Sequence, residues 1–187
     1  MASLVATPGL TAITDLEEAR RHLLEDSLRG VEIVREFDGP IVDVGSGGGV
    51  PGIPLAASLP AREVTLLEAT RRKVEFLERW TDRLPNLRVV WGRAEEQETD
   101  RFGVAVAKAL APPPVALEWC LPLVAPGGAA VLWVGESADP AALAAVAEQL
   151  GSTAPDEHGS RLVFRKLVPT PSGFPRRVGV ARKRPLA

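Results

Sequence analysis

The sequence predicts an α/β fold in which a doubly wound, mostly parallel sheet carries helices on both faces. Two observations predict it. The stretch from Ile41 to Ser58 has the pattern of a short buried strand, a turn with five glycines within eight residues, and the start of a helix. This is the first unit of a nucleotide-binding α/β fold. From there to about residue 168, predicted strands and amphipathic helices alternate, which is typical of parallel sheets.

Local signals predict the individual elements in chain order. Thr14 and Glu17 have the spacing of a capping box, so a helix is expected over about residues 15–29, ending at Gly30. A second short helix over 31–37 leads into the central strand, 41–44. After the glycine turn, apolar periodicity predicts strands over 63–68, 87–91, 103–109, 129–134 and 161–168, helices over 71–84, 112–124 and 140–150, a turn over 126–128, and a last short strand over 177–181.

Length and composition fit one domain. A chain of 187 residues with 45% hydrophobic and 25% charged residues can bury a sizeable core. We divide it into an N-terminal helical segment (1–38), a Rossmann-like core (39–168) and a basic tail rich in proline and arginine (169–187). One cysteine, Cys120, excludes an internal disulfide framework. Because neither a signal peptide nor a spanning segment is evident, we expect a cytoplasmic protein.

Charge is distributed unevenly along the chain. No acidic residue follows Glu157, whereas 8 of the 22 basic residues do. The first 157 residues therefore hold 14 basic and 24 acidic residues, a net charge of −10. A basic end on an acidic body is expected where that end meets a polyanion. It is expected equally of a solvated tail that keeps a protein soluble, and charge alone does not separate the two.

The glycine turn and the strand before it indicate the class of ligand. From Gly45 the spacing is Gly-x-Gly-x-Gly, and Val50 stands where the dinucleotide pattern requires its third glycine. Asp43 lies at the carboxyl end of the strand, where a carboxylate would repel a pyrophosphate and attract a cation. S-adenosylmethionine carries an ammonium and a sulfonium group and no phosphate, so it fits better than NAD. The alternative is a plain βα turn with a solvated aspartate.

Two more residues are expected at the same edge of the sheet. Glu68 ends the second strand, 25 residues after Asp43, where an acidic residue of Rossmann-like folds binds ribose hydroxyls. Lys108 stands near the end of the fourth strand and faces the same crevice if the sheet is parallel. The alternatives are a surface glutamate and a snorkelling surface lysine. Cys120 has no base nearby, and we interpret it as core filler.

Five segments in a fixed order carry a resemblance to a known family. They are VDVGSGGGVPGIPLA, LLEATRRKVEFL, GRAEE, AVAKALAP and PRRVGVARKRPL. They are similar to segments of the small-subunit ribosomal RNA guanine-N7 methyltransferases, also called glucose-inhibited division protein B. The resemblance extends from about Gly9 to the C-terminus. It implies a class I S-adenosylmethionine-dependent methyltransferase fold and methylation of one guanine in 16S rRNA.

Matched position by position, the resemblance implies a site for S-adenosylmethionine. Gly45 and Val50 would line its methionine end, and Glu68 with the two following residues would hold the ribose and adenosine side. Ala94 and Glu95 would flank the adenine. Lys108 occupies a position at which the family usually has arginine. The predicted cofactor-binding residues are Asp43, Gly45, Ser46, Gly47, Gly49, Val50, Glu68, Ala69, Thr70, Ala94, Glu95 and Lys108.

Three departures from the family pattern concern mainly the substrate side. Lysine at position 108 cannot reproduce the planar five-donor fork of arginine. Val134-Gly135 replaces the usual Lys-Gly, which removes a cation from the crevice. The N-terminal segment is short, and RHLLEDSL holds one residue more than the usual Arg-His-x-Leu-Asp-Ser-Leu. One inserted residue turns a helix by about 100°, so we expect Asp26 and Ser27 to lose their usual placement relative to Arg21 and the sheet.

No catalytic residue is assigned from the sequence. Guanine N7 has an in-plane lone pair, so no proton must be removed before it attacks a methyl group, and holding the reacting atoms in line suffices. We expect no metal, no membrane association, a monomer, and 16S rRNA or the small ribosomal subunit as partner. The candidate RNA contacts are two residues of the first helix and five cations of the tail: Arg21, His22, Arg176, Arg177, Arg182, Lys183 and Arg184.

Three other functions stay open at this point. The acidic body and the lost cations favour a class I methyltransferase that acts on a small molecule. A non-catalytic domain that binds the cofactor or RNA as a regulator is the alternative from another class, and NAD binding is a third. Unless RNA binding is shown, we interpret His22 as a polar residue on the surface of its helix.

Overall fold

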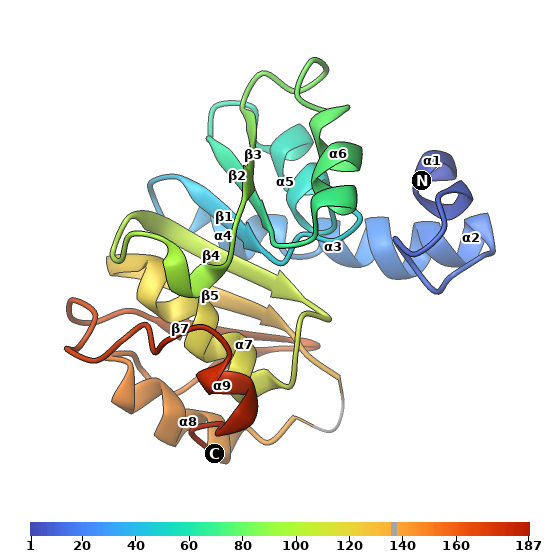
Figure 1. The fold of residues 1–187 in the computed structure, drawn as a ribbon. Helices are drawn as coiled ribbons and strands as arrows, with labels where there is room; N and C mark the ends of the chain where they lie inside the picture. The colour runs from blue at the N-terminus through green and yellow to red at the C-terminus, as the bar shows by residue number, and fades with distance from the viewer. Residues whose placement is uncertain (136–137) are drawn as a thin grey trace.

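A computed structural model describes residues 1–135 and 138–187 and shows, within them, a seven-stranded sheet between two layers of helices (Figure 1). The strand order is β3-β2-β1-β4-β5-β7-β6. Strands β1 to β5 are parallel, β7 is antiparallel to β5, and β6 is antiparallel to β7. The bounds are β1 (Ile41–Val44), β2 (Val64–Glu68), β3 (Leu87–Trp91), β4 (Phe102–Lys108), β5 (Val124–Trp133), β6 (Asp156–His158) and β7 (Arg161–Arg165). The predicted, mostly parallel sheet is confirmed.

Alternate residues of the buried strands enter two apolar cores, one on each face of the sheet. Ile41 and Val104 pack on one face, and Val42 and Ala105 on the other. The first core includes side chains of α1 (Ala2–Ala6), α4 (Val31–Arg35), α5 (Gly52–Ser58) and α6 (Arg71–Glu78). The second includes α7 (Pro113–Cys120), α8 (Pro140–Gln149), α9 (Val180–Lys183) and the 3₁₀ turns η2 (Ala94–Glu96) and η3 (Leu121–Leu123).

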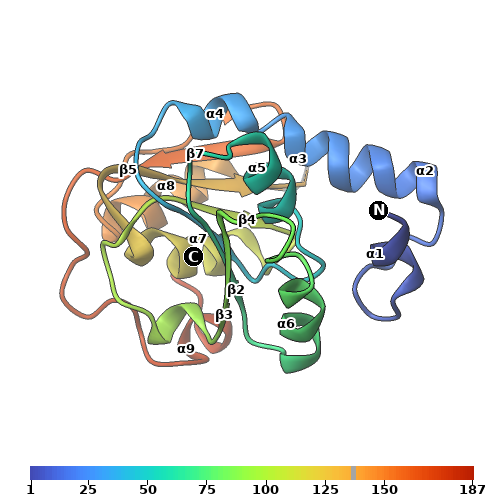
Figure 2. The ribbon, with the colours of Figure 1, turned by 90° about the horizontal axis from the view of Figure 1, so that it is seen from above.

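The N-terminal helix departs from the prediction in a way that explains the inserted residue. It consists of α2 (Leu16–Ala19), the π-helical segment η1 (Arg20–Glu25) and α3 (Asp26–Leu28), and it extends beyond the sheet, with α1 beside it (Figure 2). The N–H of Asp26 donates to the carbonyl of Arg21, five residues back. A π-helical turn holds one residue more than an α-helical turn, so it takes up the insertion. Ser27 is buried, and Asp26 faces the end of β4, where it pairs with Lys108. The expected change in their placement relative to Arg21 stays a prediction.

The helix also starts one residue later than predicted. Its N-cap is Asp15, not Thr14: the Asp15 carboxylate accepts from the N–H of Glu18 at 2.7 Å. Aspartate at this position places a negative charge at the positive end of the helix, which threonine cannot do.

Further along the chain, several boundaries differ from the prediction. Strand β5 begins at Val124 and runs through the predicted turn, and its register against β4 shifts there. A Cβ at Gly128 would lie 2.2 Å from the carbonyl oxygen of Gly103, so glycine permits this close approach of two strands. Helix α6 ends at Glu78, and strand β6 was not predicted.

The predicted strand over 177–181 is wrong. The segment forms helix α9, which starts after Gly179 in the left-handed region, φ +80°. The left-handed conformation of Gly179 precedes the helix, and Ala181 within α9 is buried, where α9 packs against α7. Among residues 1–135 and 138–187, no helix is both long and apolar enough to cross a membrane.

Candidate functional site

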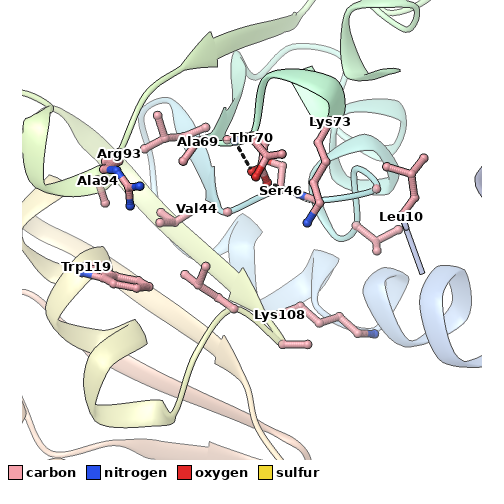
Figure 3. Close-up of a pocket in the computed structure, with 18 of the residues that line it drawn as sticks. Leu10, Val44, Ser46, Ala69, Thr70, Lys73, Arg93, Ala94, Lys108 and Trp119 are labelled. Carbon is pink, nitrogen blue, oxygen red and sulfur yellow. Dashed lines mark hydrogen bonds between the residues drawn. The ribbon is translucent and has the colours of Figure 1, made fainter. Parts of the chain in front are cut away.

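A cavity of about 520 Å³ opens at the carboxyl edge of the sheet, above the ends of β1, β2 and β4. Figure 3 shows that its walls come from the glycine turn, the end of β2, the segment after β3, α7 and the end of β4. Of the twelve predicted cofactor-binding residues, ten line this cavity, and the two exceptions are Asp43 and Gly49. Crevices at this edge of open parallel sheets are where such folds bind ligands.

The main chain of the glycine turn is one wall of the cavity. Gly45 and Gly47 have φ values of +68° and +57°, a region that favours glycine. A Cβ added to Gly47 would meet no protein atom closer than 3.8 Å, so it would project into the open cavity. A ligand can therefore lie directly against the backbone at Gly47.

Glu68 ties the glycine turn to the end of β2. Its side chain is buried, and its two oxygens accept from two main-chain donors: Oε2 from the N–H of Gly47 at 2.9 Å and Oε1 from the N–H of Thr70 at 2.7 Å. A carboxylate has about four lone-pair directions, so two stay available on the cavity side. The carboxylate is thus fixed in position and can still accept hydrogen bonds from a pair of hydroxyls.

Asp43 lies beneath the glycine turn and not in the cavity. It is 1% exposed, and its Oδ2 accepts from the N–H of Gly52 at 2.9 Å, at the start of α5. Burial raises the pKa of this carboxyl from 3.8 to about 7, partly offset by the Gly52 hydrogen bond. We predicted that Asp43 attracts a cationic group of the cofactor. In the structure Asp43 does not line the cavity and instead supports the glycine turn from below.

Gly49 is also required by packing. A Cβ there would lie 2.2 Å from Cδ1 of Ile53 and 3.2 Å from Leu77. Glycine at this position lets α5 approach the turn and the neighbouring helix. The sequence pattern alone could not separate this glycine from those that face the ligand.

Lys108 joins the cavity to the N-terminal helix. Its side chain lines the cavity, and its Nζ donates to the carbonyl of His22 at 2.6 Å and pairs with the carboxylate of Asp26. Arg161, at the start of β7, lies 3.6 Å from the other oxygen of Asp26, and Trp133 donates from Nε1 to the Asp26 carbonyl at 3.1 Å. Two cations thus share one carboxylate, which leaves positive charge at this end of the cavity.

The same cluster places a cation close to Val134, where the resemblance indicates that a lysine is missing. Arg161 is the register partner of Trp133 in the antiparallel β5–β7 pair, next to Val134. The neighbouring strand therefore supplies a guanidinium near the place where the family usually has lysine. Antiparallel pairing of β7 with β5 was not evident from the sequence, so this compensation was not predicted.

The cavity lining also includes Lys73, Arg93 and Trp119, which were not among the predicted site residues, and Arg182, which was predicted only as an RNA contact. Figure 3 shows Lys73, on α6, and Arg93 and Trp119, on the opposite side. Trp119 is 8% exposed, its Nε1 has no hydrogen-bond partner within the described part of the chain, and the Arg182 guanidinium lies 5.3 Å from its ring centroid. For Lys73, its position in the first helical turn after β2 could have indicated a place at the site. For Trp119 no such signal exists, because the sequence around it has the pattern of an ordinary core helix.

The predicted RNA contacts divide into two groups. Arg176 forms a two-point ion pair with the buried Glu118, 2.6 Å from Nε to Oε1, and donates to the carbonyl of Arg184. It fastens the tail to α7, so its assignment as a free RNA contact is corrected. The other six are exposed, and the carbonyl of His22, not its ring, makes the bond to Lys108.

A further contact holds the tail at the cavity. The N–H of Gly179 donates to Oε1 of Glu95 at 3.2 Å, and Glu95 lines the cavity. Arg182, on α9, also lies over Trp119 and lines the cavity, so the tail brings one exposed cation to the cavity wall.

Comparison with known proteins gives a consistent result. A family model described as rRNA small subunit methyltransferase G matches residues 2–153. Two relatives named Ribosomal RNA small subunit methyltransferase G are 35% identical over 199 residues (Synechococcus elongatus) and 37% identical over 200 residues (Alkaliphilus metalliredigens). The alignments cover 95% of this chain in both cases, and 82% and 83% of the relatives.

Solved structures show the same fold at low sequence identity. An S-adenosylmethionine-dependent O-methyltransferase from Thermotoga maritima has a TM-score of 0.62 at 15% identity, covering 86% of this chain and 72% of that one. The 1,6-didemethyltoxoflavin-N1-methyltransferase from Burkholderia thailandensis, with bound S-adenosylhomocysteine, has a TM-score of 0.61 at 15% identity and covers 81% of each chain. The predicted class I methyltransferase fold is confirmed.

The buried Asp43 predicts a specific pH dependence of stability. Between its ordinary pKa of 3.8 and its folded pKa of about 7, the folded chain binds more protons than the unfolded chain. The free energy of unfolding due to this group therefore falls as pH rises through that window. Asp43→Asn keeps an oxygen that accepts from Gly52 and removes the titration.

Urea unfolding of both proteins from about pH 4 to about pH 8 checks this. The stability of the variant relative to the parent should increase with pH and level off above pH 7. A difference that stays constant over the whole range would contradict the assigned protonation of Asp43.

Proposed function

The chain belongs to the family of rRNA small subunit methyltransferase G, and we propose that it transfers the methyl group of S-adenosylmethionine to N7 of one guanine in 16S rRNA. One observation supports the location of the site: ten of the twelve residues predicted from the glycine turn and the resemblance meet around one cavity at the carboxyl edge of the sheet. Those residues come from four separate segments, so their meeting is not a consequence of nearness in sequence.

The residues of the cavity fit S-adenosylmethionine, which supplies a methyl group on a positively charged sulfur. The cavity volume of about 520 Å³ is in the range of cofactor sites. Glu68 can accept from the two ribose hydroxyls, because each of its oxygens has one lone pair left after the bonds to Gly47 and Thr70. The bare backbone at Gly47 lets the cofactor lie against the turn.

The task left to the protein is orientation. Guanine N7 needs no general base, so the catalytic effect rests on holding the nucleophile in line with the methyl group. Lys108, the last residue of β4, is the side chain best placed to orient the substrate. It lines the cavity, and Asp26 and the His22 carbonyl hold its ammonium group. Because the Lys108 side chain is already held in place, it loses less conformational entropy on binding an anionic group than a mobile lysine side chain would.

The RNA is expected to meet the protein along the rim of the cavity. Arg177, Arg182, Lys183 and Arg184 are exposed, and the tail that carries them is fastened to α7 by Arg176. We infer that the protein acts as a cytoplasmic monomer on 16S rRNA or on the small ribosomal subunit.

One observation still favours a small-molecule substrate, the net charge of −10 on the first 157 residues. Assays with protein-free rRNA, 30S particles and a panel of small methyl acceptors separate the two functions. Methyl transfer to RNA alone supports the proposal, and transfer to a small molecule alone replaces it.

The first prediction here concerns the cofactor. Gly47→Val should abolish S-adenosylhomocysteine binding, because the added side chain occupies the cavity. Glu68→Ala should weaken binding by roughly 1.5–3 kcal/mol for each charge-assisted hydrogen bond removed. Calorimetric titration measures both.

Gly127→Val is the matched control for Gly47→Val. Gly127 also has a positive φ, +87°, and open space around its Cβ position, but it lies outside the cavity. It should bear a comparable backbone strain and leave the affinity unchanged. If Gly47→Val and Glu68→Ala bound S-adenosylhomocysteine like the parent, the cofactor would bind elsewhere.

The second prediction concerns Lys108. Lys108→Arg should keep or raise the rate of methyl transfer, since a guanidinium can still reach Asp26 and the His22 carbonyl. Lys108→Ala should lower kcat. Steady-state kinetics on rRNA would show it, and equal kcat in parent and both variants would leave Lys108 as a surface lysine only.

The third prediction concerns the tail. Replacing Arg177, Arg182, Lys183 and Arg184 by serine should weaken RNA binding and flatten its dependence on salt, by about 0.7 in the log–log slope for each phosphate that the tail no longer neutralises. S-adenosylhomocysteine affinity should change little by comparison. Filter binding over a salt series measures the affinity for RNA and its salt slope.

A variant with Arg29, Arg35, Arg79 and Arg83 replaced by serine loses the same charge at exposed positions outside the cavity lining. Its salt slope should stay close to that of the parent. Identical slopes for the two variants would mean that the tail acts only through net charge.

A further inference from the structure

Trp91 is an exposed aromatic side chain held in a fixed orientation. It is the last residue of β3 and is 60% exposed, whereas Trp119 and Trp133 are each 8% exposed. Its Nε1 donates to the carbonyl of Ala69 at 3.1 Å, and the guanidinium of Arg71 lies 5.2 Å from its ring centroid. One edge and one face of the ring are therefore engaged, and the exposed surface is chiefly the other face and the far edge.

The ring stands beside the mouth of the cofactor cavity. Ala69, which accepts the Nε1 hydrogen bond, lines the cavity, and so does Arg93, two residues after Trp91. The cavity-lining Lys73 follows Arg71 in the first turn of α6. Trp91 thus lies between the cations of α6 and Arg93, in the segment after β3.

Three cations near the ring, Arg71, Lys73 and Arg93, suit an anionic ligand. Lys73 and Arg93 form no ion pair within the described residues, while Arg71 has one exposed partner, Glu75, at 3.4 Å. An isolated aromatic ring among cations is not the contiguous apolar patch of a protein–protein interface. Aromatic rings next to cations bind single-stranded nucleic acid, because a base stacks on the ring while the cations meet its phosphates.

The position of Trp91 in the sheet separates it from the site of methyl transfer. In the order β3-β2-β1-β4, the strand that carries Trp91 is three strands from the one that carries Lys108. Neighbouring strands are about 4.8 Å apart, so the two strand ends are roughly 14 Å apart. A base on Trp91 is therefore a different nucleotide from the one whose N7 reaches the methyl group.

We propose that Trp91 is a stacking platform for an unpaired nucleotide of the RNA substrate, with Lys73 and Arg93 on its phosphates. The inference rests on the proposed function, because it takes RNA as the substrate. It adds a second point of contact, on the opposite side of the cavity from Lys108, that would orient the RNA across the cavity mouth.

The test measures affinity for protein-free 16S rRNA with the cofactor site saturated by S-adenosylhomocysteine. Trp91→Ala should weaken RNA binding by between about 5-fold and about 150-fold, the range for loss of one base–aromatic stack. Trp91→Phe keeps a stacking face and should stay within about 3-fold of the parent. Affinity for S-adenosylhomocysteine should be unchanged in both, because Ala69 is exposed and water can replace the lost donor.

Leu167→Ala is the matched control, since Leu167 is 62% exposed and lies outside the cavity lining. It should bind RNA like the parent. RNA should also quench part of the tryptophan fluorescence of the parent, and Trp91→Phe should remove that part of the signal.

Equal RNA affinity of Trp91→Ala and the parent would overturn the inference while leaving the proposed function intact. Weaker binding of Trp91→Ala to 30S particles but not to protein-free rRNA would also overturn it, because Trp91 would then contact a ribosomal protein. A parent protein that neither binds nor methylates rRNA would overturn the proposed function, and this inference with it.

Discussion

The cavity depends on two buried carboxylates that hold the glycine turn from opposite sides. Glu68 binds the N–H of Gly47 from the cavity side, and Asp43 binds the N–H of Gly52 from below. The N–H groups of Gly45 and Gly49 bond to main-chain carbonyls, whereas those of Gly47 and Gly52 bond to these two side chains. Without the side-chain bonds, two donors of this segment would lose their partners, and the wall of the cavity would be held less firmly.

The two ends of the chain complete the site that the sheet begins. The N-terminal helix reaches the end of β4 through Asp26 and Lys108, and its π-helical segment provides the carbonyl of His22. The tail reaches the other side through the pair between the half-buried Arg176 and the buried Glu118, and through the bond from Gly179 to Glu95. Breaking one partner of a buried ion pair is strongly destabilising, so the tail is a structural part of the site as well as a basic surface.

The sequence was sufficient for the parts of the fold that local chemistry determines. Strand 41–44, the glycine turn and Glu68 at the end of β2 each follow from residue type and spacing, and they are where the prediction placed them. It was insufficient where tertiary pairing decides. Arg161 beside Trp133 depends on an antiparallel strand pair, the helical form of residues 180–183 depends on packing against α7, and the burial of Asp43 depends on the approach of Gly52.

The most direct measurement identifies the methylated nucleoside. Protein-free 16S rRNA and 30S particles are incubated with the protein and methyl-labelled S-adenosylmethionine, and the RNA is digested to nucleosides for mass spectrometry. The label should appear in 7-methylguanosine at a single position, and Glu68→Ala should reduce it without changing the position. Label in another nucleoside, or transfer only to a small molecule, would contradict the proposed function.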